Sequence, residues 1–281
     1  MIKVLHPGMY STIQDQGRTG FAMIGVPISG AMDVYSSKLG NQILNNNLND
    51  AVVEITFGGA KFQFDKELVV CLTGANFNPM IDGVRVDQNL AFKVKKDTIL
   101  SFGKKEFGVR TYLCVQGGFD TEAILKSKSF YTGITSQSIL KKGDVLPVFD
   151  TKMYAVTANS KIKVEAKHFT MQRIECTIGP EFNLLSKKQQ NLLTESVFTI
   201  SNDNNRMGYR LEEIVKNDFK DILTSGVLPG TVQLTPSGKL IVLMRDCQVT
   251  GGYPRVLQLT KESINILAQK TTNNTIRFSV K

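Results

Sequence analysis

The stretch Met80-Ile81-Asp82-Gly83-Val84-Arg85-Val86 places a turn-forming pair between two short strand-forming runs. Asp-Gly tolerates the positive φ angles that a type I′ turn needs at both central positions, so residues 80–86 predict a tight β-hairpin. Similar short runs, separated by turn residues, extend on both sides of it and cover residues 51–56, 61–64, 68–72, 90–94, 98–102 and 110–115. Strands this closely spaced, with few helical patterns between them, favour a barrel or sandwich over a doubly wound sheet.

A second β-rich region follows a long connecting stretch from Asp120 to about Lys167. Its predicted strands cover residues 172–178, 197–200, 231–234, 240–244, 256–259 and 275–280. Three short helices are predicted: one capped by Asp33 and ending in the run Asn45-Asn46-Asn47, and two over residues 186–194 and 260–268. We therefore expect a mainly β chain with a few short helices, in two domains covering residues 1–166 and 167–281.

Composition excludes several classes of protein. The 281 residues are 42% hydrophobic and 21% charged, which is ordinary for a globular chain and excludes overall disorder. The net charge of +9 comes from scattered lysines rather than a basic stripe, so we expect no nucleic-acid partner. No run is long enough to span a bilayer and the N-terminus lacks a signal-peptide pattern, so no membrane association and a cytoplasmic location are expected. The four cysteines are predicted to be buried apolar residues without disulfides.

Two neighbouring segments near the N-terminus, residues 8–18 and 25–33, are richer in glycine and small polar residues than a simple edge loop requires. Glycine permits close backbone approach, so the segments suit a ligand cradle. The alternative is a pair of tight turns whose side chains satisfy their own backbone. Their candidate binding and catalytic side chains are Thr12, Gln14, Asp15, Arg18, Ser29 and Asp33.

Two further polar clusters lie in the second half. In residues 202–210, Arg206 and Arg210 flank a glycine and an aromatic residue and suit bidentate binding of a carboxylate or phosphate. Residues 246–254 directly follow an apolar strand, so their polar groups emerge at a strand end, where binding groups are common. An interface role for the arginines and a plain turn at residues 246–254 are the alternatives.

Known catalytic constellations are missing from the sequence. Its two histidines, His6 and His168, lie in no HExxH motif, GxSxG elbow or CxxC pair, and no Walker A or GxGxxG motif occurs. We therefore predict no protein-held metal site. An enzyme with this sequence would have to use carboxylates, amides and arginines.

Several strings in this order resemble one known family. They are TIQDQGRTG (12–20), GVPISGAMD (25–33), Glu54-Ile55-Thr56, NRMGYRL (205–211), Gly230-Thr231-Val232-Gln233 and residues 246–254. The chain is similar to the KipA-like family, also described as the 5-oxoprolinase C subunit, allophanate hydrolase subunit 2 or the biotin-dependent carboxyltransferase family. The resemblance spans nearly the whole chain and implies tandem cyclophilin-like β-barrels.

The resemblance also implies an activity and partners. It suggests an ATP-dependent hydrolase that opens 5-oxo-L-proline to L-glutamate, with ATP and Mg²⁺, together with a KipI-like B subunit plus an A subunit. A lactam is a poor electrophile, so activation by phosphoryl transfer would call for positioning and charge stabilisation rather than a nucleophilic side chain. At the motif positions, side-chain chemistry suggests three roles. Binding of anionic groups is assigned to Arg18, Arg206 and Arg210, and proton transfer or binding of hydrated Mg²⁺ to Asp33, Glu54 and Asp246. Substrate or nucleotide binding and orientation is assigned to Thr12, Gln14, Asp15, Ser29, Gln233, Gln248, Thr250 and Tyr253.

Two other functions remain open at this point. One is a regulatory protein that sequesters a KipI-like kinase inhibitor, and the other is the carboxyltransferase of a urea carboxylase-like system. In every case the clusters are expected to converge, with Gln14, Arg206 and Gln248 in one site.

Overall fold

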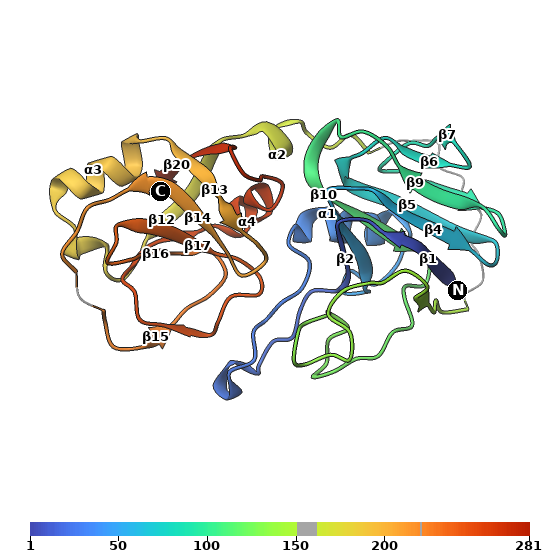
Figure 1. The fold of residues 1–281 in the computed structure, drawn as a ribbon, viewed down its shortest axis with the longest axis horizontal. Helices are drawn as coiled ribbons and strands as arrows, with labels where there is room; N and C mark the ends of the chain where they lie inside the picture. Colours follow the sequence, from blue (N-terminus) through green and yellow to red (C-terminus); the bar gives the residue numbers. More distant parts are fainter. Residues whose placement is uncertain (151–161, 220) are drawn as a thin grey trace. The chain divides into compact units, whose positions relative to one another are not determined.

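The computed structural model describes residues 1–150, 162–219 and 221–281. They form two compact units (Figure 1). The first comprises Met1–Arg18 and Ser29–Phe169, and the second Thr19–Ile28 and Thr170–Lys281. The change of unit after Phe169 lies close to the domain boundary expected at residue 166, whereas the grouping of Thr19–Ile28 with the second unit was not expected. Part of the expected connecting stretch, residues 151–161, lies outside the described residues.

Two sheets form the first unit. One has the strand order β11-β1-β4-β9-β6-β7 and consists of β1 (Ile2–Pro7), β4 (Ala60–Phe64), β6 (Pro79–Ile81), β7 (Val84–Arg85), β9 (Ile99–Phe102) and β11 (Val145–Leu146). The other has the order β2-β3-β10-β5-β8 and consists of β2 (Tyr10–Gln14), β3 (Val52–Thr56), β5 (Leu68–Asn76), β8 (Ala91–Val94) and β10 (Phe107–Val115). The predicted Asp82-Gly83 turn joins β6 and β7, and both residues have positive φ.

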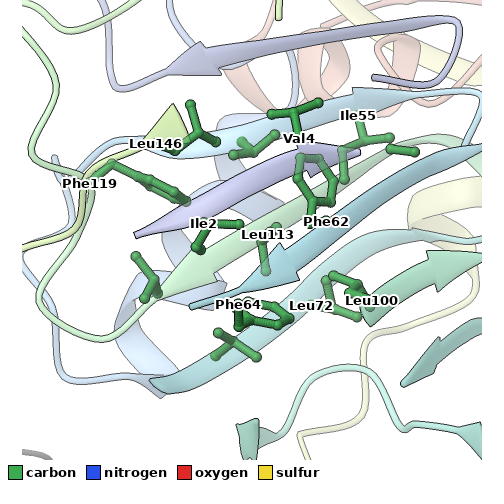
Figure 2. Packing of buried hydrophobic residues seen from close by; sticks show 14 of the residues in the cluster. Ile2, Val4, Ile55, Phe62, Phe64, Leu72, Leu100, Leu113, Phe119 and Leu146 are labelled. Carbon is green, nitrogen blue, oxygen red and sulfur yellow. The ribbon is translucent and has the colours of Figure 1, made fainter. Parts of the chain in front are cut away.

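The core of the first unit lies between these two sheets. Figure 2 shows Phe62 and Phe64 of β4 packing with Leu72 of β5 and Leu113 of β10, and all four side chains are fully buried. Burial of such apolar side chains is the main favourable contribution to the stability of a unit of this kind. Alternate residues of the second sheet point away from this core, as the two-residue period of a strand requires.

Helix α1 (Val34–Ile43) packs on that outward face of the second sheet, against β5 and β10. Asp33 caps it as predicted, because its side chain accepts a hydrogen bond from the Ser36 amide at 3.1 Å. The Thr73 hydroxyl on β5 donates to the Ser36 carbonyl at 2.7 Å. The helix and the sheet together bury a second, smaller apolar cluster that includes Cys71 and Cys114.

The second unit is built on a closed barrel. Its strand order is β12-β19-β16-β17-β14-β13-β20, with β12 (Arg173–Ile178), β13 (Phe198–Asn204), β14 (Gly208–Ile214), β16 (Thr231–Leu234), β17 (Lys239–Leu243), β19 (Arg255–Leu259) and β20 (Thr275–Val280). Strand β20 closes it by pairing in parallel with β12 and antiparallel with β13. A separate two-stranded ribbon joins β15 (Ser225–Gly226) to β18 (Thr250–Gly251).

The remaining helices are short. They are α2 (Lys167–Thr170), α3 (Lys187–Glu195), α4 (Lys261–Leu267) and the 3₁₀ turns η1 (Ala22–Ile24) and η2 (Phe182–Leu184). Ser186 and Gln189 form a capping box at the start of α3, and Thr260 caps α4. Within the described ranges, none of the helices has the length and apolar character that crossing a membrane would take.

The expectation of a mainly β chain with a few short helices is confirmed. The second unit contains a closed barrel, and the first is built from two sheets. The four cysteines are buried and free, also as predicted. Two segments that the sequence singled out as polar clusters, without predicting strands in them, are partly strands. Residues 10–14 form β2, and residues 202–210 include the turn between β13 and β14. Both were missed because polar side chains on these strands hide the alternation of apolar residues.

Candidate functional site

A cavity of about 210 Å³ lies on the outer face of the barrel in the second unit. Arg210 on β14, Ile241 on β17 and Gln233 on β16 occupy directly opposite positions on neighbouring strands, so their side chains form one row across the sheet. Alternate residues of β17, such as Val242, are fully buried in the barrel. The cavity is lined by Asn205, Met207, Gly208, Arg210, Gln233, Ile241, Leu243, Gln248 and Tyr253.

Four residues predicted from three separate sequence motifs meet in this cavity: Arg210, Gln233, Gln248 and Tyr253. Gln233 is almost fully buried, and its amide nitrogen lies 3.5 Å from the Tyr253 carbonyl oxygen. Gly251 packs against this side chain, because a Cβ atom there would come within 2.5 Å of the Gln233 amide nitrogen and require that side chain to shift. The polar side chains of the cavity are amides, a phenol and a guanidinium, which suit a small ligand with carboxylate or carbonyl acceptors.

Two of the other three predicted residues of this region, Arg206 and Asp246, form a buried ion pair beside the cavity. Arg206 Nε and Nη2 donate to the two Asp246 carboxylate oxygens at 2.7 and 2.9 Å. The Asp246 amide also donates to the Arg206 carbonyl at 2.8 Å. The pair therefore joins the β13–β14 turn to the segment after β17, and both segments contribute residues to the cavity lining. Thr250, on β18, is exposed and does not line it.

In the first unit, Thr12, Glu54, Tyr112 and Thr73 occupy opposite positions on β2, β3, β10 and β5. They form a buried polar row under the N-terminus of α1. Glu54 Oε2 accepts hydrogen bonds from the Met32 amide at 2.7 Å and the Tyr112 hydroxyl at 2.9 Å. Glu54 thus holds the chain at the start of the helix, and its proposed catalytic role stays a prediction.

Asp33 lies at the end of this network and contacts a residue that the sequence did not single out. His168 Nε2 lies 2.8 Å from Asp33 Oδ2, and the Ser36 hydroxyl donates to the same oxygen at 2.6 Å. The imidazole packs against the Tyr35 ring, with 5.0 Å between ring centroids. The contact joins residues 135 positions apart, and no local motif signals it.

The remaining predicted residues of the first unit bind to their own chain. Asp15 accepts hydrogen bonds from the Ser127 and Ser129 hydroxyls at 2.7 and 2.6 Å, and Arg18 donates to the Ser129 carbonyl. Ser29 is buried with a φ of 58°. These contacts tie Asp15 and Arg18 to residues 127–129 rather than to the backbone of their own turns, and their binding role stays a prediction.

Gln14 is the exception in this group. Its amide nitrogen donates to the Thr12 hydroxyl at 3.1 Å, while its buried Oε1 has no hydrogen-bond partner among the described residues. Gln14 belongs to the first unit and Arg206 and Gln248 to the second, and their convergence in one site stays a prediction.

A protein-held Mg²⁺ does not fit the described residues. Within residues 1–150, 162–219 and 221–281, no group of three or more His, Cys, Asp or Glu side chains is arranged to hold a metal ion. Of the three candidate carboxylates, Asp33 contacts His168, Glu54 contacts Tyr112, and Asp246 is paired with Arg206.

Comparisons with known proteins agree with this architecture. The family model described as carboxyltransferase domain, subdomain A and B, matches residues 24–280. The chain is 33% identical to the 5-oxoprolinase C subunit of Escherichia coli and 31% identical to that of Haemophilus influenzae, and in both cases the match covers 99% of this chain and 90% of the relative. The crystal structure of Kluyveromyces lactis urea carboxylase matches 99% of this chain with a TM-score of 0.86 and 26% identity, although the match covers only 27% of that much longer chain.

Proposed function

The chain belongs to the carboxyltransferase domain family, subdomain A and B, and from this membership we propose that it is the C subunit of an ATP-dependent 5-oxoprolinase. In this reaction 5-oxo-L-proline is opened to L-glutamate. Two relatives with this name match the chain over 99% of its residues and 90% of their own length, which supports the same role for this chain.

The cavity at Arg210 carries the proposal. Its volume of about 210 Å³ is below the ~300–1,000 Å³ typical of pockets for drug-sized ligands, so it suits a small metabolite. The Arg210 guanidinium would hold the substrate carboxylate, and the side-chain amides of Gln233 and Gln248 would donate to the lactam oxygen. The apolar side chains of Ile241 and Leu243 would contact the ring methylenes.

The proposed chemistry needs few reactive side chains. Phosphoryl transfer from ATP to the lactam oxygen turns that oxygen into a leaving group. Water then adds to the activated carbon, and the ring C–N bond breaks as the nitrogen takes up a proton, which leaves an acyl phosphate. A second water hydrolyses this acyl phosphate to the carboxylate and free phosphate. The contribution of this chain is to orient the lactam and to stabilise charge on its oxygen.

ATP is too large for the Arg210 cavity. The nucleotide therefore binds elsewhere in the proposed complex, which also contains the KipI-like B subunit and the A subunit. Because the described carboxylates do not form a metal site, any Mg²⁺ would arrive with the nucleotide phosphates, as is usual for this ion. No step assigned to this chain depends on it.

The test is ATP turnover by the purified chain mixed with the B and A subunits. We expect turnover that depends on 5-oxoproline, and a loss of at least about tenfold in kcat/KM for Arg210→Gln and for Gln248→Ala. Arg85→Gln is the matched control for Arg210→Gln, because Arg85 is also an exposed arginine paired with an exposed carboxylate, Glu106. Full activity in both cavity variants would remove this cavity from the reaction.

The same assay separates the two other functions. Tight binding of the B subunit without turnover, even after the A subunit is added, would indicate a regulatory protein that sequesters its partner. The match to Kluyveromyces lactis urea carboxylase supports a second candidate, carboxyl transfer to urea. Transfer of carboxyl from carboxybiotin to urea, with no response to 5-oxoproline, would favour it.

A further inference from the structure

Strands β12 and β20, which close the barrel of the second unit, carry a hollow that the proposed function does not use. Its volume is about 780 Å³, and its lining includes Arg173 of β12, Arg277 of β20 and Thr194 near the end of α3. No residue of the Arg210 cavity lines it. The hollow is therefore a separate feature of the same unit.

The two arginines stand side by side. Arg173 and Arg277 are directly opposite each other in the parallel pairing of β12 and β20, and the next pair, Ile174 and Phe278, is buried in the barrel. Side chains alternate between the faces of a sheet, so both guanidinium groups emerge on the outer face. Like charges at directly opposite positions destabilise a sheet, unless an opposite charge sits between them.

No carboxylate of the described residues forms an ion pair with either guanidinium group. Glu175, two positions after Arg173 on the same face of β12, is paired with Lys281 at 2.5 Å. The hydrogen bond from Lys281 is the main cause of the lowered pKa of the Glu175 carboxyl, and the charge of Arg173 adds to it. Lys281 thus offsets the charge of Glu175, and the two arginines add positive charge to the hollow.

We propose that this hollow binds a phosphate-bearing small molecule, with Arg173 and Arg277 donating paired hydrogen bonds to the phosphate oxygens. A planar guanidinium group matches phosphate geometry through two parallel N–H donors. The volume falls within the ~300–1,000 Å³ range of ligand pockets, so it admits a phosphate ester of nucleotide size as well as a free phosphate. Gln172 and Ser279, which also line the hollow, supply additional neutral donors. The proposal does not depend on the 5-oxoprolinase reaction.

The experiment titrates the full chain with inorganic phosphate, pyrophosphate and ATP by isothermal calorimetry, with adenosine as the uncharged comparison. We expect binding of at least one phosphate compound, and affinity reduced at least about tenfold in the double variant Arg173→Gln/Arg277→Gln. Tighter binding of ATP than of pyrophosphate would identify a nucleotide, and equal binding would identify the phosphate group alone as the ligand.

The matched control is Lys187→Gln/Lys188→Gln, which removes the same number of charges from exposed positions on α3. We expect it to bind phosphate within about twofold of the unmodified chain, because exposed charges outside the site are largely screened by salt. Equal weakening in both double variants, or no binding of any phosphate compound by the unmodified chain at millimolar concentrations, would overturn the proposal. If circular dichroism shows that the double arginine variant is unfolded, Arg277→Gln alone provides the same comparison. Retained binding by that folded variant would likewise overturn the proposal.

Discussion

Glu54 and Tyr112 lie directly opposite each other on β3 and β10, and the Tyr112 hydroxyl donates to Glu54 Oε2 at 2.9 Å. The same hydroxyl accepts a hydrogen bond from the Asp33 amide at 2.8 Å. Both side chains are buried, and burial, followed by the charges of Glu54 and Asp33, raises the pKa of Tyr112 well above its ordinary value. The phenol therefore stays protonated and keeps its role as the donor to Glu54.

Tyr112→Phe tests the importance of this contact for stability. The change removes one donor from a buried carboxylate and one acceptor from a buried amide, so we expect unfolding free energy to fall by about 2–3 kcal/mol. Urea denaturation measures it. Tyr35→Phe, at a tyrosine that is 44% exposed, is the control and should change stability by less than about 0.5 kcal/mol. If Tyr112→Phe also lowers the free energy of unfolding by less than about 0.5 kcal/mol, the Tyr112 hydroxyl is not needed for stability.

The buried ion pair of Arg206 and Asp246 predicts a different pattern. Asp246→Asn removes the negative charge and leaves the Arg206 guanidinium buried with weakened partners, so we expect a loss of about 3–5 kcal/mol in thermal or urea unfolding. Arg206→Met/Asp246→Leu removes both charges and should recover most of that loss. For comparison, Arg210→Met breaks an exposed pair with Asp203 and should cost no more than about 1 kcal/mol. Equal losses in the single and double variants of the buried pair would contradict this account.

Gly40 of α1 lies directly against β5 and β10. A Cβ atom there would collide with Cys114 Sγ and approach Thr73 Oγ1 to 3.2 Å. Gly40→Ala should therefore destabilise the chain by about 1–3 kcal/mol, even though alanine favours a helix more than glycine does. The double variant Gly40→Ala/Cys114→Ala makes room for the new methyl group. In a double-mutant cycle, the double variant should lose less unfolding free energy than the sum of the losses in the two single variants. Losses that simply add would show that no collision occurs.

The buried cysteines predict a loss of stability at alkaline pH. Burial raises the pKa of Cys71 and of Cys247 to about 12, and that of Cys176 to about 11, from an ordinary value of 9.0. Between about pH 9 and those values the unfolded chain binds fewer protons than the folded chain, so the free energy of unfolding decreases as pH rises. Lys270 acts in the opposite direction, because burial lowers its pKa.

Urea denaturation between pH 8 and pH 10.5 measures this slope. We expect the decrease to be shallower in Cys247→Ala than in the unmodified chain, since one titrating thiol has been removed. Identical slopes in the two proteins would mean that the Cys247 thiol does not contribute.

Sequence patterns predicted most of the strands, because β-branched and apolar runs between turn residues identify a strand without knowledge of its partners. The Asp33 cap and the Asp82-Gly83 turn were also predictable, since each depends on neighbours within four residues. Strand β2 was not predicted. Its outward residues Thr12 and Gln14 are polar and buried under other parts of the chain, so local hydropathy gives no indication of the sheet.

In the candidate site, too, the residues in local motifs could be predicted, and the contacts made by tertiary packing could not. Arg210, Gln233, Gln248 and Tyr253 were selected by motif and do line one cavity. The ion pair of Arg206 with Asp246 and the contact of His168 with Asp33 depend on tertiary packing across 40 and 135 positions, which a single sequence does not encode in any local pattern. The pairing of Arg173 with Arg277 is of the same kind.

The position of β20 in the barrel has a consequence for biosynthesis. This strand pairs with both β12 and β13, yet it follows every other strand of the second unit in the chain. While the ribosome has released only residues before Thr275, β12 and β13 each present an open edge, and exposed edges invite pairing with other chains. The barrel can therefore close only after residues 275–280 have been synthesised, and until then chaperones or an assembly partner that covers these edges would protect the chain from aggregation.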